Sequence, residues 1–313
     1  MQSRIIIFSG NSNLPLALKV CSALGVSLCK ALVGRFSDGE VRVEIGENVR
    51  GMDVYVIQST CPPVNENLVE FLVMIDALKR ASARRINTVI PYYGYGRQDQ
   101  KVKPRVSVAS KMVADLLTVA GADRVITIDL HADQIEGFFK IPVDHLMGTH
   151  VLLDDLRTRL QGGEIIVAPD AGGVERARGF AKRLNVDLAV MDHRSTVDES
   201  SSRMVGNVKG RRVIILDDMV DTGSTLIRTA KGAEAAGAAS IEAYCVHALL
   251  SGDAGAKIDA SPIRFLTVTD TVPLSARVAQ IAKIRTVSIA AMLAETIRRV
   301  HYEESVSSLF SRS

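Results

Sequence analysis

Short apolar runs with the composition of β-strands recur along this chain of 313 residues, and helix-like segments separate them. The helix-like segments include 67–81, 107–120 and 225–236. Strands that alternate with helices are typical of parallel sheets covered by helices, because parallel neighbours need a long crossover connection. The predicted strands are 5–8, 54–58, 86–90, 125–128, 165–168, 188–191, 213–216, 241–245 and 265–269.

The length of the chain and its rhythm indicate two domains. A chain of 313 residues is long enough for two domains of ordinary size. Both halves show a similar succession of strands and helices, so two related domains are expected. We interpret the segment 142–149, which follows a full set of strands and helices, as the linker between them.

Composition excludes several classes of protein. The net charge of +3 is too small to indicate a nucleic-acid-binding surface. The four cysteines show neither metal-ligand spacing nor a disulfide framework. The apolar run at the N-terminus is too short for a signal peptide, and no apolar stretch approaches the roughly 18 residues of a membrane span. We therefore expect a soluble, cytoplasmic protein that binds neither nucleic acid nor membranes.

The stretch V-I-I-L-D-D-M-V-D-T-G-S-T-L, residues 213–226, carries the clearest chemical signal. A buried strand leads into acids and hydroxyl residues, and a helix follows; the loop residues are Asp217, Asp218, Asp221, Thr222, Gly223, Ser224 and Thr225. A helix N-terminus attracts an anion, and small residues let a phosphate approach the backbone. The acids would repel that phosphate, so they are expected to bind sugar hydroxyls or a metal ion joined to it. A phosphorylated sugar satisfies both halves of the loop; the alternative, an ordinary capping cluster, needs only one acid.

Other polar segments also follow predicted strands. They are P-Y-Y-G-Y-G-R-Q-D-Q after 86–90, D-L-H-A-D-Q after 125–128 and P-D-A-G-G after 165–168. Ligands of open α/β sheets bind beyond the carboxyl ends of the strands, so these segments indicate one composite site. A solvated basic loop is an equal alternative for the cluster Arg97, Lys101, Lys103 and Arg105, and a structural role is an equal alternative for the pair Asp129 and His131.

The segment F-S-D-G-E-V-R-V-E-I-G-E-N-V-R-G, residues 36–51, predicts a hairpin. Polar and apolar residues alternate from Glu40 to Ile45, and we place the turn near Gly46. A protruding hairpin that carries an aromatic residue and two acids is able to reach a neighbouring subunit.

These segments together resemble the ribose-phosphate pyrophosphokinase family, also called phosphoribosyl pyrophosphate synthetases. The acid-rich loop is similar to the phosphoribosyl-binding loop of the phosphoribosyltransferase fold, and F-S-D-G-E, R-Q-D, D-L-H, P-D-A-G-G and E-S-V-S-S-L-F extend the resemblance over nearly the whole chain. The resemblance implies an α/β fold with two phosphoribosyltransferase-like domains, each a mainly parallel sheet flanked by helices. We expect the ATP-binding domain at 1–146, joined by the tail 302–313, and the ribose 5-phosphate domain at 147–301.

The resemblance also implies roles for individual residues. ATP contacts fall to Phe36, Asp38 and Glu40, which reach adenine from a neighbouring subunit, and to Arg97 and Gln98. His131 and Asp170 are expected to hold Mg²⁺ with the ATP phosphates. Asp217 and Asp218 take the ribose hydroxyls, and 221–225 take the 5-phosphate. The family implies dimers that assemble into a hexamer and an allosteric site for phosphate and ADP, which would include Arg50, Ser82, Arg105, Ser305 and Phe310.

The implied reaction moves the diphosphoryl group of ATP to the anomeric hydroxyl of ribose 5-phosphate and releases AMP. Family members carry a lysine and a nearby arginine after L-A-V-M-D, where this chain has His193 and Ser195, with Arg194 between them. Either Arg194, aided by His193, supplies the missing cation, or the chain is a weak or inactive paralogue that serves as a regulatory nucleotide-binding subunit. A phosphoribosyltransferase that uses a base as nucleophile is a third hypothesis, but no base-binding segment is evident.

Overall fold

The computed structural model describes residues 4–193 and 202–307, which form two compact units. The first unit holds the described residues up to Met147, together with Thr271–Pro273 and the segment from Ile289 onward. The second unit holds Gly148–Asp270 and Leu274–Ser288. The chain therefore returns to the first unit with its last helix.

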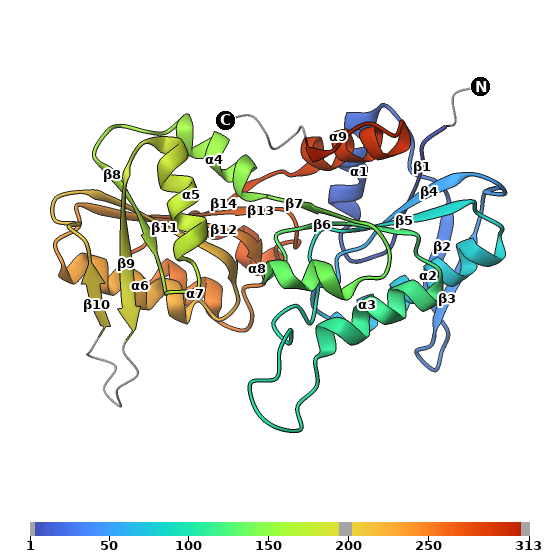
Figure 1. Cartoon of the computed structure of the whole chain (residues 1–313), viewed down its shortest axis with the longest axis horizontal. Coiled ribbons are helices and arrows are strands. Elements are labelled where there is room, and N and C mark those ends of the chain that lie inside the picture. Colours follow the sequence, from blue (N-terminus) through green and yellow to red (C-terminus); the bar gives the residue numbers. More distant parts are fainter. Residues whose placement is uncertain (1–3, 194–201, 308–313) are drawn as a thin grey trace. The chain divides into compact units, whose positions relative to one another are not determined.

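The first unit is built on a five-stranded sheet in the order β1-β4-β5-β6-β7, and all its strands run parallel (Figure 1). Its central strands are buried along most of their length, which explains why they are nearly continuous apolar runs in the sequence. Its strands are β1 (Ile6–Ser9), β4 (Asp53–Ile57), β5 (Arg85–Ile90), β6 (Arg124–Ile128) and β7 (Val143–Leu146). Its helices are α1 (Leu14–Leu24), α2 (Val64–Arg80), α3 (Ala109–Ala120), α9 (Ala290–His301) and the 3₁₀ helix η1 (Asp133–Phe138).

The hairpin in the first unit differs from the prediction. β3 (Val41–Ile45) lies where the alternating pattern predicts a strand, but it pairs antiparallel with the preceding strand β2 (Ala31–Arg35). The turn therefore lies at 36–40, and the prediction of a turn near Gly46 is wrong. Asp-Gly is a strong turn signal, and Gly39 takes a left-handed φ of 94° there. Gly46 instead donates to the carbonyl oxygen of Lys30 at 2.9 Å and so extends the pairing.

The segment predicted as a linker, 142–149, contains a strand. β7 pairs in parallel with β6, and Val143 lies opposite Val125. Leu146 is fully buried, which anchors this edge strand to the sheet. A strand of four residues is too short for its periodicity to be recognised, so only its pairing with β6 reveals it.

The second unit has a seven-stranded sheet in the order β10-β9-β8-β11-β12-β13-β14. All neighbours run parallel except β9 and β10. Its strands are β8 (Glu164–Ala168), β9 (Asp187–His193), β10 (Ser202–Val205), β11 (Arg212–Val220), β12 (Ser240–Ala248), β13 (Phe265–Thr269) and β14 (Ile284–Val287). Its helices are α4 (Thr149–Arg157), α5 (Val174–Leu184), α6 (Ser224–Ala235), α7 (Ala254–Asp259) and α8 (Ala276–Ala279).

Every predicted strand overlaps an observed one, and the predicted fold class is confirmed: each unit is a mainly parallel sheet flanked by helices. Each unit has its own aliphatic core, with Phe71, Met74 and Val113 in the first and Val213, Leu226 and Val268 in the second. Within the described part of the chain, no helix combines the length and the apolar character that a membrane crossing requires.

Candidate functional site

The acid pair of the second unit lies on a strand. Asp217 and Asp218 were expected in the loop after residue 216, but β11 continues to Val220 because β12 pairs alongside it that far. Asp217 is paired with Cys245 in this ladder, and its Oδ1 accepts the backbone N–H of Asp218 at 2.9 Å. Burial, and next the charge of Asp218, raise the pKa of Asp217 to about 8. The pair therefore holds a proton near neutral pH.

Arg176 is a neighbour of both acids that sequence reasoning missed. Its Nη1 lies 3.9 Å from Oδ1 of Asp217 and 3.6 Å from Oδ1 of Asp218. It comes from α5, the helix that follows the P-D-A-G-G segment. The guanidinium group supplies a positive charge beside the pair, which helps a site with two carboxylates to accept an anionic ligand. No local motif points to Arg176, because only the packing of α5 against β11 brings it there.

The loop after β11 leads directly into α6. Gly223 has a left-handed φ of 77°, which an L side chain rarely adopts, and α6 begins at Ser224 without a side-chain cap on its first turn. The hydroxyls of Thr222 and Ser224 are exposed and lie 3.0 Å apart. Exposed hydroxyl groups thus lie at the positive end of the helix, where the sequence predicts a phosphate-binding turn.

Asp170 lies in the loop between β8 and α5. Its Oδ1 accepts the backbone N–H of Gly173 at 2.9 Å, so one carboxylate oxygen holds the start of α5. Asp170 itself is exposed. The same loop therefore positions Asp170 and, in the first turn of the helix, Arg176.

One of the two residues predicted as catalytic, His193, lies at the end of β9. The backbone of His193 is the last residue of this strand and pairs with Ser202 of β10. β9 and β10 are antiparallel, and residues 194–201 connect them. Arg194 lies outside the described residues, so its role stays a prediction.

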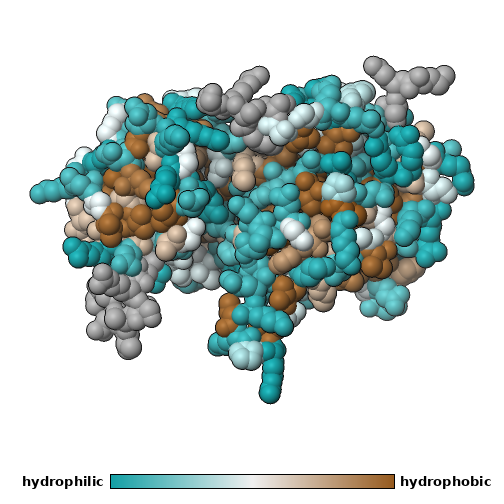
Figure 2. Space-filling view, in the orientation of Figure 1, coloured by the Kyte–Doolittle hydropathy of each residue, from teal (hydrophilic) through white to brown (hydrophobic). Residues whose placement is uncertain are grey.

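In the first unit, Arg97 and Gln98 lie on the loop between β5 and α3, and both are exposed. This loop extends away from the strand and helix that it joins, and its surface is mostly hydrophilic (Figures 1 and 2). The start of the loop packs closely against neighbouring residues. A β-carbon added at Gly94 would lie 2.4 Å from the carbonyl oxygen of Thr60, and one added at Gly96 would lie 3.6 Å from the Cβ of His131. The structure thus brings the Arg97 segment next to His131.

His131 follows β6 and is exposed. The two residues before it are fixed by burial and by a hydrogen bond. Asp129 is buried with a left-handed φ of 37°, and Nε2 of His145 accepts the backbone N–H of Leu130 at 2.9 Å. Burial lowers the pKa of His145, so it stays a neutral acceptor near neutral pH. Asp99 and Gln134 join the two loops through a hydrogen bond of 2.8 Å. His145 and Gln134 are supporting residues that the sequence alone did not identify.

The turn of the β2–β3 hairpin presents Phe36, Asp38 and Glu40, and all three side chains are exposed. The Phe36 ring is 51% exposed, and the Arg42 guanidinium lies 5.7 Å from its centroid. Oδ1 of Asp38 accepts the backbone N–H of Glu40 at 3.1 Å and orders the turn. An exposed aromatic ring on the same turn as two acids is a surface that suits a partner or a base.

The residues predicted for an allosteric site are distributed over several loops of the first unit. Gly51, next to Arg50, donates to the carbonyl oxygen of Ser82 at 2.9 Å, so these two loops meet. Arg105 lies on the β5–α3 loop, and the carbonyl oxygen of Ser305 accepts from Arg299 at 2.8 Å. Phe310 lies outside the described residues.

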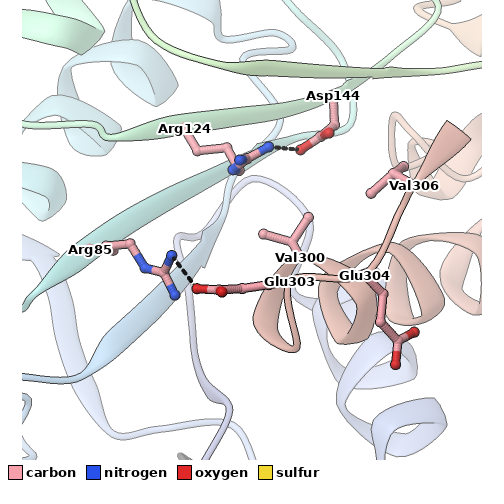
Figure 3. Close-up of a pocket in the computed structure, with 7 residues that line it drawn as sticks. All are labelled: Arg85, Arg124, Asp144, Val300, Glu303, Glu304 and Val306. Atoms are coloured by element: carbon pink, nitrogen blue, oxygen red, sulfur yellow. Dashed lines mark hydrogen bonds and ion pairs between the residues drawn. The ribbon is translucent and has the colours of Figure 1, made fainter.

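A pocket of about 330 Å³ lies at the amino ends of β5 and β6, which is the end of the sheet opposite to the carboxyl ends of its strands (Figure 3). Arg124 pairs with Asp144 at 2.7 Å, and Arg85 pairs with Glu303 at 3.5 Å. Arg85 also pairs with Asp53, and Glu304 pairs with Arg298 at 2.9 Å, so the charged residues of the pocket already have ion-pair partners in the protein. None of the residues predicted for the site is among those that line this pocket.

Among the described residues, no group of three or more His, Cys, Asp or Glu side chains is arranged to hold a metal ion. A metal with a cage made only of these protein ligands is therefore not built into the described part of the chain. An ion that keeps substrate oxygens and waters needs fewer protein ligands, and magnesium has this preference.

Comparisons with known proteins point to one family. Residues 5–121 match the model of the N-terminal domain of ribose phosphate pyrophosphokinase, and residues 196–311 match the phosphoribosyl synthetase-associated domain. A ribose-phosphate pyrophosphokinase from Ralstonia nicotianae is 51% identical over 310 residues, which cover 98% of each chain. One from Bordetella pertussis is 52% identical over 309 residues, covering 98% of this chain and 100% of that protein. The crystal structure of phosphoribosylpyrophosphate synthetase from Mycobacterium smegmatis superposes with a TM-score of 0.92 at 37% identity, covering 96% and 100% of the two chains.

Proposed function

The chain belongs to the ribose-phosphate pyrophosphokinase family, and from this premise we propose how its residues carry the reaction. It transfers the diphosphoryl group of ATP to the anomeric hydroxyl of ribose 5-phosphate, which yields phosphoribosyl pyrophosphate and AMP. The hydroxyl attacks the β-phosphorus of ATP in line, and AMP leaves with the bridging oxygen. Such a transfer depends mainly on positioning and on neutralising charge over the phosphate oxygens.

The observation that carries the proposal is the junction of β11 and α6. Asp217 and Asp218 stand beside Arg176, and exposed hydroxyls follow at the first turn of α6. We assign the ribose hydroxyls to the two acids, and the 5-phosphate to Asp221, Thr222, Gly223, Ser224 and Thr225. The carboxylates accept hydrogen bonds from hydroxyls, and the helix N-terminus attracts the phosphate.

We assign ATP to the first unit. Arg97 and Gln98 are exposed on the loop after β5, and the close approach of Gly96 places this loop beside His131. Phe36, Asp38 and Glu40 supply the adenine contact to a neighbouring subunit. This assignment requires an oligomer, and we propose a homo-oligomer of dimers that assemble into a hexamer. The allosteric role of Arg50, Ser82, Arg105, Ser305 and Phe310 and a cytoplasmic location stay predictions.

The proposed metal is Mg²⁺, with His131 and Asp170 as its protein ligands. Two ligands suit an ion that keeps phosphate oxygens and waters, and the loops around both residues are held by hydrogen bonds from the backbone. When bound, the ion neutralises charge on the transferring phosphates. The chain itself orients the two ligands: His145 fixes the backbone before His131, and the Gly173 N–H fixes the Asp170 carboxylate.

The last residue of β9 and the residue that follows it in the sequence are the remaining candidates for a cationic role. We propose that Arg194, aided by His193, contacts the transferring group in place of the family's lysine and arginine. Replacing Arg194 by Ala is expected to lower the rate by roughly 10³–10⁵, by analogy with other arginines that stabilise phosphoryl transfer. A His193→Lys variant that gained several orders of magnitude over the wild type would instead favour the regulatory-subunit alternative.

Tracing the label of ATP that is labelled at the γ-phosphorus tests the reaction directly. With wild-type protein and ribose 5-phosphate, the label is expected in phosphoribosyl pyrophosphate, with AMP in equal amount. Omitting ribose 5-phosphate is expected to abolish AMP formation. Label recovered with ADP as the nucleotide product, or no AMP at micromolar protein, would contradict the proposal.

A further inference from the structure

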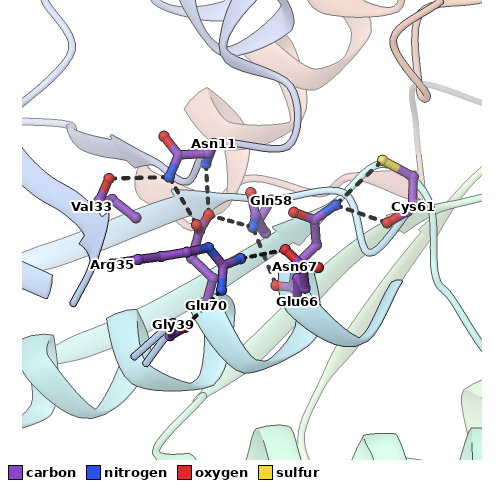
Figure 4. A network of polar contacts seen from close by, with 9 residues as sticks. All are labelled: Asn11, Val33, Arg35, Gly39, Gln58, Cys61, Glu66, Asn67 and Glu70. Carbon is purple, nitrogen blue, oxygen red and sulfur yellow. Dashed lines mark hydrogen bonds and ion pairs between the residues drawn. The ribbon is translucent and has the colours of Figure 1, made fainter. Parts of the chain in front are cut away.

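A buried carboxylate lies next to the proposed ATP-binding segments, in a position to which no role has been assigned. Glu70, on α2, is 3% exposed, and its two oxygens accept three N–H groups (Figure 4). Oε1 accepts from the backbone N–H of Asn11 at 2.7 Å and from Nε2 of Gln58 at 2.8 Å. Oε2 accepts from Nδ2 of Asn11 at 2.8 Å. A buried carboxylate needs such donors, so its surroundings tolerate little change.

The donors come from loops at the carboxyl ends of two strands. Asn11 lies between β1 and α1, and Gln58 directly follows β4. Oε1 of Gln58 also accepts from the backbone N–H of Ser12 at 3.1 Å and from its hydroxyl at 2.7 Å. The packing is tight, since a β-carbon added at Gly10 would lie 2.4 Å from Oε1 of Gln58 and 2.8 Å from Oε1 of Glu70. Hydrogen bonds and close packing therefore fix the loop after β1 against Glu70.

Asn11 continues this network to the hairpin. Its Nδ2, besides bonding to Glu70, donates to the carbonyl oxygen of Val33 in β2 at 3.2 Å. One turn earlier on α2, Oε2 of Glu66 accepts from Arg35 at 2.7 Å, and Arg35 also donates to the carbonyl oxygen of Gly39 at 3.1 Å. α2 thus has two polar connections to the hairpin: one runs from the buried Glu70 through Asn11, and the other is the exposed pair of Glu66 and Arg35.

We propose that Glu70 is a positioning residue that, through Asn11, fixes the β2–β3 hairpin in the orientation in which its turn recognises adenine. An isolated two-stranded hairpin is marginally stable in water, so this one needs an external anchor to present a defined surface. Holding the turn in its binding conformation before the nucleotide arrives reduces the entropy lost on binding. The inference rests on the proposed function, which assigns adenine contacts to Phe36, Asp38 and Glu40.

Replacing Glu70 by Gln tests this role in the full-length protein. The side chain keeps its size, but one acceptor oxygen becomes an N–H group that faces a donor. Loss of one hydrogen bond to a charged group is worth about 1.5–3 kcal/mol, so KM for ATP is expected to rise about 10- to 150-fold. The preference for ATP over GTP in kcat/KM is expected to fall, while KM for ribose 5-phosphate stays within about twofold because its proposed contacts lie elsewhere.

The matched control is Glu66→Gln, on the same helix and the same hairpin. Its side chain is 55% exposed, and exposed ion pairs contribute about 0–1 kcal/mol, so KM for ATP is expected to rise less than about fivefold. Asn11→Ala removes the exposed link between Glu70 and β2, and it carries the same expectation as Glu70→Gln should that variant fail to fold. Combining Glu70→Gln with Asn11→Ala is expected to raise KM for ATP little beyond the larger of the two single effects.

Three results separate the inference from its premise. A Glu70→Gln protein that keeps its KM for ATP and its nucleotide preference would overturn the inference. So would a parallel rise of both KM values with a lowered Tm, since that is the signature of a merely structural residue. Absence of AMP formation in the wild-type protein would instead be the failure of the proposed function, and it would be seen before any variant is made.

Discussion

At the scale of single residues, the acid pair shows how surroundings decide the chemistry of a side chain. Two adjacent aspartates on an exposed loop would both be ionised at neutral pH. On β11, burial and the neighbouring charge raise the pKa of Asp217 to about 8, while Arg176 stands close to both carboxylates. The ligand-free pair is thus poised to release its proton when hydroxyl groups or cations arrive.

This shift predicts a pH dependence of stability. Because the folded-state pKa of Asp217 lies above its ordinary value of 3.8, folding favours the protonated acid. The stabilising contribution is complete below about pH 4 and is lost as the pH rises through about 8. Chemical denaturation gives the free energy of unfolding of the wild type and of Asp217→Asn at each pH. The wild-type value minus the variant's is therefore expected to fall as the pH rises from 5 to 8.5. Parallel curves for the two proteins would contradict the shift.

At the scale of elements, a close backbone approach determines where the loop between β5 and α3, the proposed ATP-binding loop, begins. Gly94 sits against Thr60, so its replacement by Ala forces the base of the loop to move. We expect a loss of about 1–3 kcal/mol of unfolding free energy, typical of overpacking, and a raised KM for ATP. Gly137→Ala, at a position with no atom within 4 Å of the added carbon, is the matched control and is expected to change stability by less than about 0.5 kcal/mol. Equal effects of both changes would argue against a seated loop.

Strand registry in the second unit depends on a buried ion cluster. Arg212, at the start of β11, lies 3.2 Å from Glu164 and 2.9 Å from Glu242, both nearly fully buried. Arg212→Met leaves two buried carboxylates without their partner and is expected to lower the free energy of unfolding by about 3–5 kcal/mol. The exposed pair of Arg157 and Asp154 provides the control, since Arg157→Met is expected to cost at most about 1 kcal/mol. Denaturant titration of both variants compares them, and similar losses would contradict the account.

The sequence predicted the buried elements well, because parallel strands covered on both faces are apolar along their length. It failed where pairing decides the structure. β7 and β14 are short edge strands, and the hairpin turn was misplaced because alternation marks β3 but does not identify its partner. The acids, hydroxyls and glycines of the candidate site were recognisable as motifs, whereas Arg176, His145 and Glu70 enter through packing between distant segments.

At the scale of the whole molecule, the proposed function divides one reaction between two units. The acid-rich strand and the first turn of α6 belong to the second unit, whereas Arg97, His131 and the hairpin turn belong to the first. This division matches a reaction in which a sugar phosphate and a nucleotide are bound by different segments and a diphosphoryl group passes from the nucleotide to the sugar. It also makes the account testable, because damage to one unit should weaken the binding of one substrate only.

The most direct test measures KM for both substrates in two variants, Asp218→Asn and Arg97→Ala. Loss of a hydrogen bond to a charged group corresponds to a rise of about 10- to 150-fold in the KM of the substrate concerned. We predict that Asp218→Asn raises KM for ribose 5-phosphate by this amount and leaves KM for ATP nearly unchanged, and that Arg97→Ala does the reverse. If both variants weakened the same substrate, or if neither altered its expected one, the assignment of ribose 5-phosphate to β11 and of ATP to the Arg97 loop would be wrong.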